Sequence, residues 1–194
     1  GWWNSSIAPA WTLKLEENGS IAGGSGNSES VNNWGGPVVI AKGKVLTLGT
    51  YSMFSSRHPD VEVEEGGTIL CASNSGDCFL KSLSGRGTVT THPNNTGYTE
   101  CKLDPAEDCV FSGTIGVNVR PIISPTASGR FVLGDANVLS EVFQVKGSRN
   151  LGFAPGIGTF KIATVHFIPD AGYPLVLEDT DGNPVTVKVA VSPT

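Results

Sequence analysis

The sequence predicts an all-β protein, a right-handed parallel β-helix (β-solenoid) with a C-terminal β-hairpin, and the alternative fold is a β-sandwich. Three observations support this class. A sequence template recurs along the chain, short alternating apolar runs bounded by turn residues are frequent, and Gly or Pro interrupts nearly every window that could form a helix. Parallel stacking of the repeats would bury side chains that one repeat alone leaves exposed.

The repeat is clearest in its first three copies. The pattern Leu13-x-Leu15-x-x-Asn18 is followed by Val38-x-Ile40-x-x-Gly43 and Val61-x-Val63-x-x-Gly66, after 25 and then 23 residues. Each copy has a short alternating strand, then a residue that tolerates positive φ, then a second strand start at Ile21, Leu46 or Ile69. This length is typical of one coil of a β-solenoid.

Strands are expected wherever β-branched and aromatic residues alternate with polar ones. Asp181-Gly182, between two of these runs, is a strong turn signal and predicts a long C-terminal hairpin. The expected strands are 44–48, 61–63, 68–71, 88–91, 130–133, 141–145, 159–167, 175–178 and 185–191.

The 194 residues are expected to form one β-solenoid domain. Within it we predict an N-terminal cap and loop over 1–36, coils over 37–170 and the hairpin over 171–194. The Gly-, Ser- and Asn-rich stretch 19–36 is interpreted as a surface loop, because matching strand templates flank it.

Four cysteines, Cys71, Cys78, Cys101 and Cys109, suggest two disulfides. Three pairings are possible. Cys71–Cys78 with Cys101–Cys109 is favoured, because each bond closes a short polar excursion. The spacing lacks the close cysteine pairs of a zinc site, so no metal is expected.

The charge pattern excludes several classes of partner. Charged residues make up 16% of the chain, the net charge is -5, and lysine and arginine are scattered singly. No basic stripe is available for nucleic acid, and no apolar run is long enough for membrane insertion. A polar, weakly charged, cysteine-bearing chain is typical of a secreted or cell-surface protein.

Several segments resemble autotransporter-passenger (autotransporter-associated β-strand) repeats. They are Val61-x-Val-x-x-Gly-Gly-Thr-Ile-Leu70, Leu83-Ser-Gly-Arg-Gly-Thr-Val89 and Phe111-Ser-Gly-Thr-Ile115, followed by Gly129-Arg-Phe-Val-Leu-Gly-Asp-Ala-Asn137. The resemblance covers roughly residues 38–137. It implies a right-handed β-helix on a bacterial surface, used for adhesion, display or attachment of other modules.

Catalytic signatures are missing from the sequence. No paired aspartates, serine-hydrolase elbow or phosphate-binding loop is present, and no cofactor is expected. Glu62 alternates with Val61 and Val63, so its carboxylate is expected in solvent. Asp179-x-Asp181-x-Asn183 has calcium-like spacing, but its glycine is misplaced for an EF-type loop, and a hairpin turn explains it without a metal.

The tryptophans give the most specific functional hint. All four, Trp2, Trp3, Trp11 and Trp34, lie in the first 34 residues. Indole rings can stack on sugars, and equally they can cover the open first coil or contact another copy of the chain. The expected function is therefore an extracellular structural or adhesive surface module without catalytic activity, which presents loops to surface glycans or a host protein. The alternatives are a carbohydrate-binding or polysaccharide-active module, and a filament subunit that assembles end to end.

Overall fold

The computed structural model describes eleven segments of the chain. These are residues 12–21, 36–48, 58–71, 78–95, 97–116, 118–135, 138, 142–146, 150–162, 164–168 and 176–189. Nearly all of their regular structure is short β-strand. The strands are β1 (Leu13–Leu15), β2 (Gly19–Ile21), β3 (Val38–Ile40), β4 (Val45–Leu48), β5 (Asp60–Val63), β6 (Thr68–Cys71), β7 (Cys78–Leu80), β8 (Ser82–Gly85), β9 (Thr88–Thr91), β10 (Thr99–Leu103), β11 (Cys109–Phe111), β12 (Thr114–Ile115), β13 (Val119–Ile123), β14 (Phe131–Leu133), β15 (Val142–Lys146), β16 (Leu151–Phe153), β17 (Thr159–Ile162), β18 (Thr164–Ile168) and β19 (Thr186–Val189).

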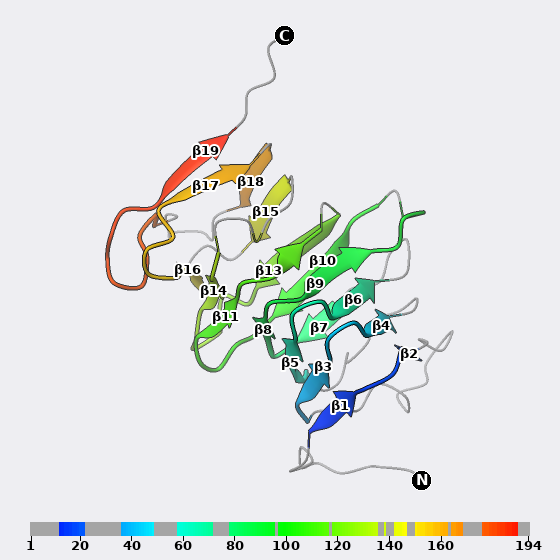
Figure 1. Cartoon of the computed structure of the whole chain (residues 1–194). Coiled ribbons are helices and arrows are strands. Elements are labelled where there is room, and N and C mark those ends of the chain that lie inside the picture. The colour runs from blue at the N-terminus through cyan, green and yellow to red at the C-terminus, as the bar shows by residue number, and fades with distance from the viewer. Residues whose placement is uncertain are drawn as a thin grey trace.

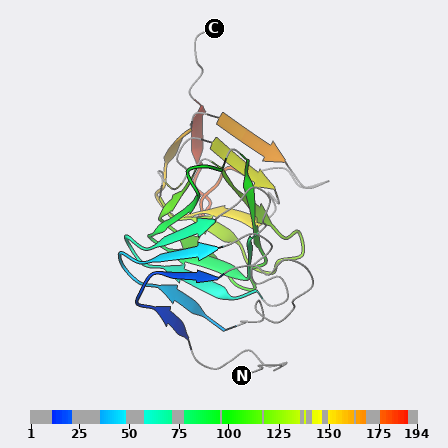
Figure 2. The same cartoon turned by 90° about the vertical axis from the view of Figure 1, so that its right-hand side faces the viewer.

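The strands stack as a right-handed parallel β-helix, which confirms the predicted fold class. The first sheet has the order β1-β3-β5-β8-β11-β14-β16, the second β12-β9-β6-β4-β2, and the third β18-β15-β13-β10-β7. A pair, β17-β19, extends the stack near its C-terminal end. The chain climbs from the N-terminal strands at one end to β19 at the other (Figure 1), and the turned view shows the sheets surrounding a shared interior (Figure 2).

The register of the first sheet is the one that the repeat predicts. Leu13 pairs with Val38, which pairs with Val61, and Leu15, Ile40 and Val63 are aligned in the same way. The alternation also holds, because Val61 and Val63 are buried while Glu62 between them is exposed. Inward apolar residues of successive coils therefore lie directly above one another.

The corner between the first and second sheets is built on stacked glycines. Gly67, Gly87 and Gly113 each precede a threonine that begins a strand of the second sheet, and the Thr88 amide donates to the Gly67 carbonyl at 2.9 Å. A Cβ added at Gly87 would lie 2.6 Å from that carbonyl oxygen. The Gly-Thr step that carried the family resemblance therefore marks a place where successive coils approach closely.

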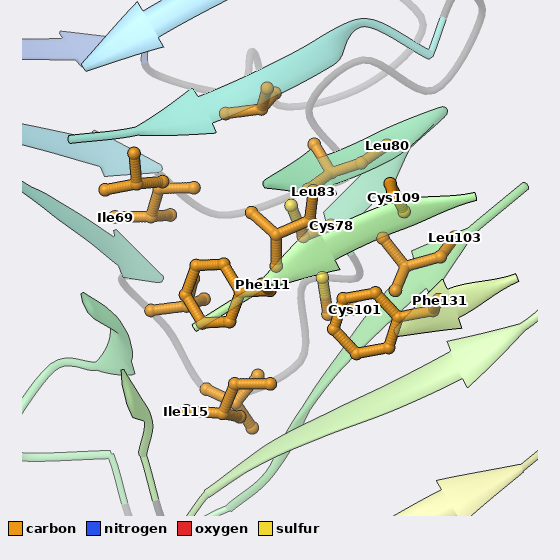
Figure 3. Close-up of a cluster of buried hydrophobic side chains, with 14 of the residues drawn as sticks. Ile69, Cys78, Leu80, Leu83, Cys101, Leu103, Cys109, Phe111, Ile115 and Phe131 are labelled. Atoms are coloured by element: carbon orange, nitrogen blue, oxygen red, sulfur yellow. The ribbon is translucent and has the colours of Figure 1, made fainter. Parts of the chain in front are cut away.

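The core runs along the axis of the stack as columns of inward side chains. In the first sheet Phe111, Leu133 and Phe153 are aligned, and each is at most 1% exposed. Leu46, Ile69, Val89 and Ile115 form the matching column of the second sheet. Figure 3 shows several of these side chains converging from the surrounding sheets.

The C-terminal hairpin differs from its prediction. The turn forms, with positive φ at Gly182 and an antiparallel bridge between Glu178 and Pro184. The strand after the turn, β19, pairs in parallel with β17 instead of returning along 175–178. Val185 is buried and Val187 packs on the core, so apolar burial against the preceding coil favours continued stacking over a free hairpin.

Two further local predictions need correction. Ile21 pairs with Leu48, not with Leu46, because the first corner is shorter, and the Asn18 side chain accepts a 3.0 Å hydrogen bond from the Val45 amide there. The expected strand 159–167 is two strands, β17 and β18, which belong to different sheets.

Candidate functional site on the third sheet

The outer face of the third sheet, together with His58 before β5 and Tyr98 before β10, holds the richest cluster of aromatic and charged side chains among the described residues. We call it the aromatic–charge strip, and its members are His58, Phe79, Tyr98, Glu100, Lys102 and Arg120. Buried and outward side chains alternate along the strands, and the outward ones form the strip. In β10, Thr99, Cys101 and Leu103 are buried, so Glu100 and Lys102 between them point outward.

One end of the strip is centred on the Phe79 ring. The His58 ring stacks on it with centroids 5.5 Å apart and planes inclined by 20°. The Lys102 ammonium lies 4.8 Å from the ring centroid, because Phe79 and Lys102 are direct partners in the β7–β10 register. The ammonium is attracted to the electron-rich face of the ring.

The other end is the stack of Arg120 on Tyr98. The guanidinium carbon lies 3.1 Å from the centroid of the Tyr98 ring, and Tyr98 is nevertheless 47% exposed. Arg120 is the direct partner of Glu100 across the β10–β13 register, and the Glu100 carboxylate lies 3.6 Å from the Lys102 ammonium. The strip thus has aromatic rings at both ends and charges of both signs between them.

This arrangement is chemically compatible with the binding of a sugar ring. An exposed aromatic face stacks on the C–H face of a sugar, while a guanidinium and a carboxylate can hydrogen-bond hydroxyl or carboxylate groups beside it. Within the described segments, no group of histidine, cysteine, aspartate or glutamate side chains is placed to hold a metal ion. Nor does any helix in those segments have the length and hydrophobicity to cross a membrane.

The predicted carbohydrate-binding residues cannot be compared with this strip. Trp2, Trp3, Trp11 and Trp34 lie outside the described residues. The strip itself was not predicted from the sequence, because Phe79, Tyr98 and Arg120 are far apart along the chain. The signal in the sequence that could have revealed the strip is the coil register, which places residues about 20 positions apart side by side.

The four cysteines are buried free thiols in the structure, and neither predicted disulfide is formed in it. Cys78 and Cys101 are direct partners on adjacent strands of the third sheet. Cys71 lies at the end of β6, whereas Cys109 lies on the first sheet opposite Phe131. Cys78 and Cys101 lie close together in Figure 3.

Asp179 explains the calcium-like spacing near the C-terminus. One carboxylate oxygen accepts hydrogen bonds from the backbone amides of Asn183 and Asp181 at 2.8 and 2.9 Å, and the other accepts one from Gly156 at 3.2 Å. These bonds, chiefly that from the Asn183 backbone, hold the pKa of Asp179 below its usual value. The carboxylate therefore anchors a turn to the preceding coil.

Comparison of the chain with protein-family models, with curated proteins and with solved structures found no match.

Proposed function

We propose that the protein is an extracellular structural or adhesive surface module that acts by binding and has no catalytic activity. The observation that carries this proposal is the in-register stack of coils, which repeats outward side chains at the spacing of neighbouring strands, about 4.8 Å. Such a scaffold holds a row of contacts with little conformational freedom left to lose on binding. The Gly-Thr steps that resemble passenger repeats support a location outside the cell.

The second candidate function is carbohydrate binding, and a specific observation favours it. Tyr98 combines substantial exposure with a guanidinium on its ring, and Glu100 lies beside that guanidinium in the register. A sugar ring would stack on the exposed part of Tyr98, while Arg120 and Glu100 orient its polar groups. Because Arg120 carries a positive charge, uronic acids are the preferred sugars.

The test is titration of the folded protein with oligogalacturonate, using neutral cello-oligosaccharide as the comparison ligand. Tyr98→Ala should weaken binding by about tenfold or more, equivalent to about 1.4 kcal/mol. Arg120→Lys should weaken binding of the acidic sugar more than that of the neutral one, because lysine keeps the charge and loses the planar fork.

Val110→Ala is the matched control. Val110 is 46% exposed on the outer face of the first sheet, so its truncation should leave sugar binding unchanged. Equal weakening in all three variants, or no binding by the unmodified protein, would exclude the strip as a sugar site. The scaffold proposal is tested separately: release of reducing ends from a panel of polysaccharides would contradict a non-catalytic role.

A further inference from the structure

The interior of the third sheet contains a group of thiols that the proposed function does not use. Cys78 is 3% exposed and Cys101 2% exposed, and both side chains point into the core from adjacent strands. Cys78 also contacts Cys71, at the end of the preceding strand. The Cys78 sulfur thus lies within reach of the sulfurs of Cys71 and Cys101, and it can form a disulfide with only one of them.

The backbone geometry distinguishes the two possible partners. Cys78 and Cys101 are direct partners in a parallel register, which sets their Cα atoms about 4.8 Å apart, inside the range that disulfides span. Flanking pairs, Phe79 with Lys102 and Leu80 with Leu103, hold this register in place. Cys71 belongs to the second sheet, where its partners are Leu48 and Thr91, so a bond from it to Cys78 would cross a corner.

We infer that Cys78 and Cys101 are a cross-linking site, joined by a disulfide between successive coils when the chain folds in the presence of a disulfide oxidant. Cys71 and Cys109 remain thiols. The inference rests on the β7–β10 register and on burial, and it is independent of the proposed function.

The chemistry is ordinary thiol–disulfide exchange with a small-molecule disulfide such as oxidised glutathione. One cysteine thiolate attacks a glutathione sulfur, forms a mixed disulfide and releases one reduced glutathione. The second cysteine loses its proton, attacks the protein-side sulfur and releases the second reduced glutathione. Two electrons pass from the cysteines to the oxidant.

The reaction belongs to the folding stage. Hydrogen bonds to the thiols of Cys101 and Cys71, together with burial, raise the pKa of Cys78 well above its usual value. The thiolate is the reactive form, so these thiols react slowly once they are buried. The bond is therefore expected in protein folded under oxidising conditions and not in protein that is oxidised after folding.

The test maps disulfides in the unmodified protein after refolding with oxidised and reduced glutathione. Free thiols are alkylated under denaturing conditions before digestion with trypsin and with a protease that cleaves before aspartate. Cleavage before Asp77 separates Cys71 from Cys78, and cleavage after Lys102 separates Cys101 from Cys109. The expected product is one cross-linked peptide pair that contains Cys78 and Cys101.

The outcomes are distinct. A Cys71–Cys78 or Cys101–Cys109 bond, or four alkylated thiols after oxidative refolding, would overturn the inference. Cys109→Ala should leave the cross-link in place, whereas Cys101→Ala should remove it. Reduction of the bond should lower the melting temperature by about 5–10 °C, because the cross-link restricts the unfolded chain.

Discussion

At the scale of single residues, the glycine corner, formed by Gly67, Gly87 and Gly113, is a place where successive coils approach closely. Gly87 sits between the coil that contains Gly67 and the coil that contains Gly113, and the Val63 side chain and the backbone of the neighbouring coil fill the space where a side chain would begin. In the sequence these glycines are visible as part of a repeat. The pattern alone does not show that the backbone of the neighbouring coil lies against each of them.

Gly87→Ala is expected to destabilise the protein by about 1–3 kcal/mol, because its Cβ would meet the Gly67 and Glu64 carbonyl oxygens at 2.6 and 2.7 Å and the coils would have to separate. Urea unfolding followed by circular dichroism measures this. Gly19→Ala is the matched control, since its Cβ would meet only the flexible end of Leu15, at 3.1 Å. An equal decrease in the free energy of unfolding in both variants would show that backbone propensity, and not the close approach of the coils at Gly87, determines the effect.

Asp179 predicts an acid-sensitive contribution to stability. Its pKa is lowered in the folded protein, so the stabilisation is fully present above the unfolded value of about 4 and is lost as pH falls through the lower folded value. Asp179→Asn should therefore lower stability at pH 7 and flatten the decline of stability below pH 4. Unfolding curves over pH 2–7 test this, and an unchanged acid slope would contradict it.

At the scale of elements, the first sheet shows why the coils must stack. Phe111 is fully buried in β11 between the coils of β8 and β14, in line with Leu133 and opposite Gly85. Phe111→Ala is expected to cost about 3–5 kcal/mol through lost burial and the resulting cavity. Val110→Ala, on the outer side of the same strand, should change stability by about 0.5 kcal/mol or less. Thermal or urea unfolding of the two variants makes the comparison.

Strands were predicted well where apolar and polar residues alternate clearly. They were predicted poorly where charged residues or proline obscure that alternation. The registers of β1, β3 and β5 followed from Leu13, Val38 and Val61 alone. The strands β10 and β13 were missed, because β10 carries two charged residues and β13 contains Pro121. Both strands are held by neighbours on either side, so tertiary burial overrides their weak intrinsic preference.

The candidate site was harder to predict than the fold. A fold repeats, so three copies of a template reveal it, whereas the aromatic–charge strip occurs once and draws on three coils. These residues form one surface because the register aligns Phe79 with Lys102 and Glu100 with Arg120. The surface can be recognised only when that register is known. The tryptophan and filament hypotheses stay predictions, since they concern residues outside the described segments or a second copy of the chain.

At the scale of the whole molecule, each coil contacts only the coils above and below it. Stability in such a stack is approximately a sum over neighbouring interfaces, so coils with two neighbours should open less often than terminal ones. Hydrogen exchange followed by mass spectrometry should show the greatest protection in β8 and β11 and faster exchange in β1 and β19. Uniform protection from end to end would indicate a single cooperative unit instead.

The glycine corner also determines where the chain tolerates added length. Between the first and second sheets the connections are short, since only Arg86 and Gly87 separate β8 from β9, and only Ser112 and Gly113 separate β11 from β12. Connections after the second sheet vary in length, with six residues between β6 and β7, seven between β9 and β10 and three between β12 and β13. The edge between the first and second sheets therefore has little room for added residues. The edge after the second sheet is where evolution, or an engineer who grafts a foreign epitope, can insert peptide without displacing the stacked strands.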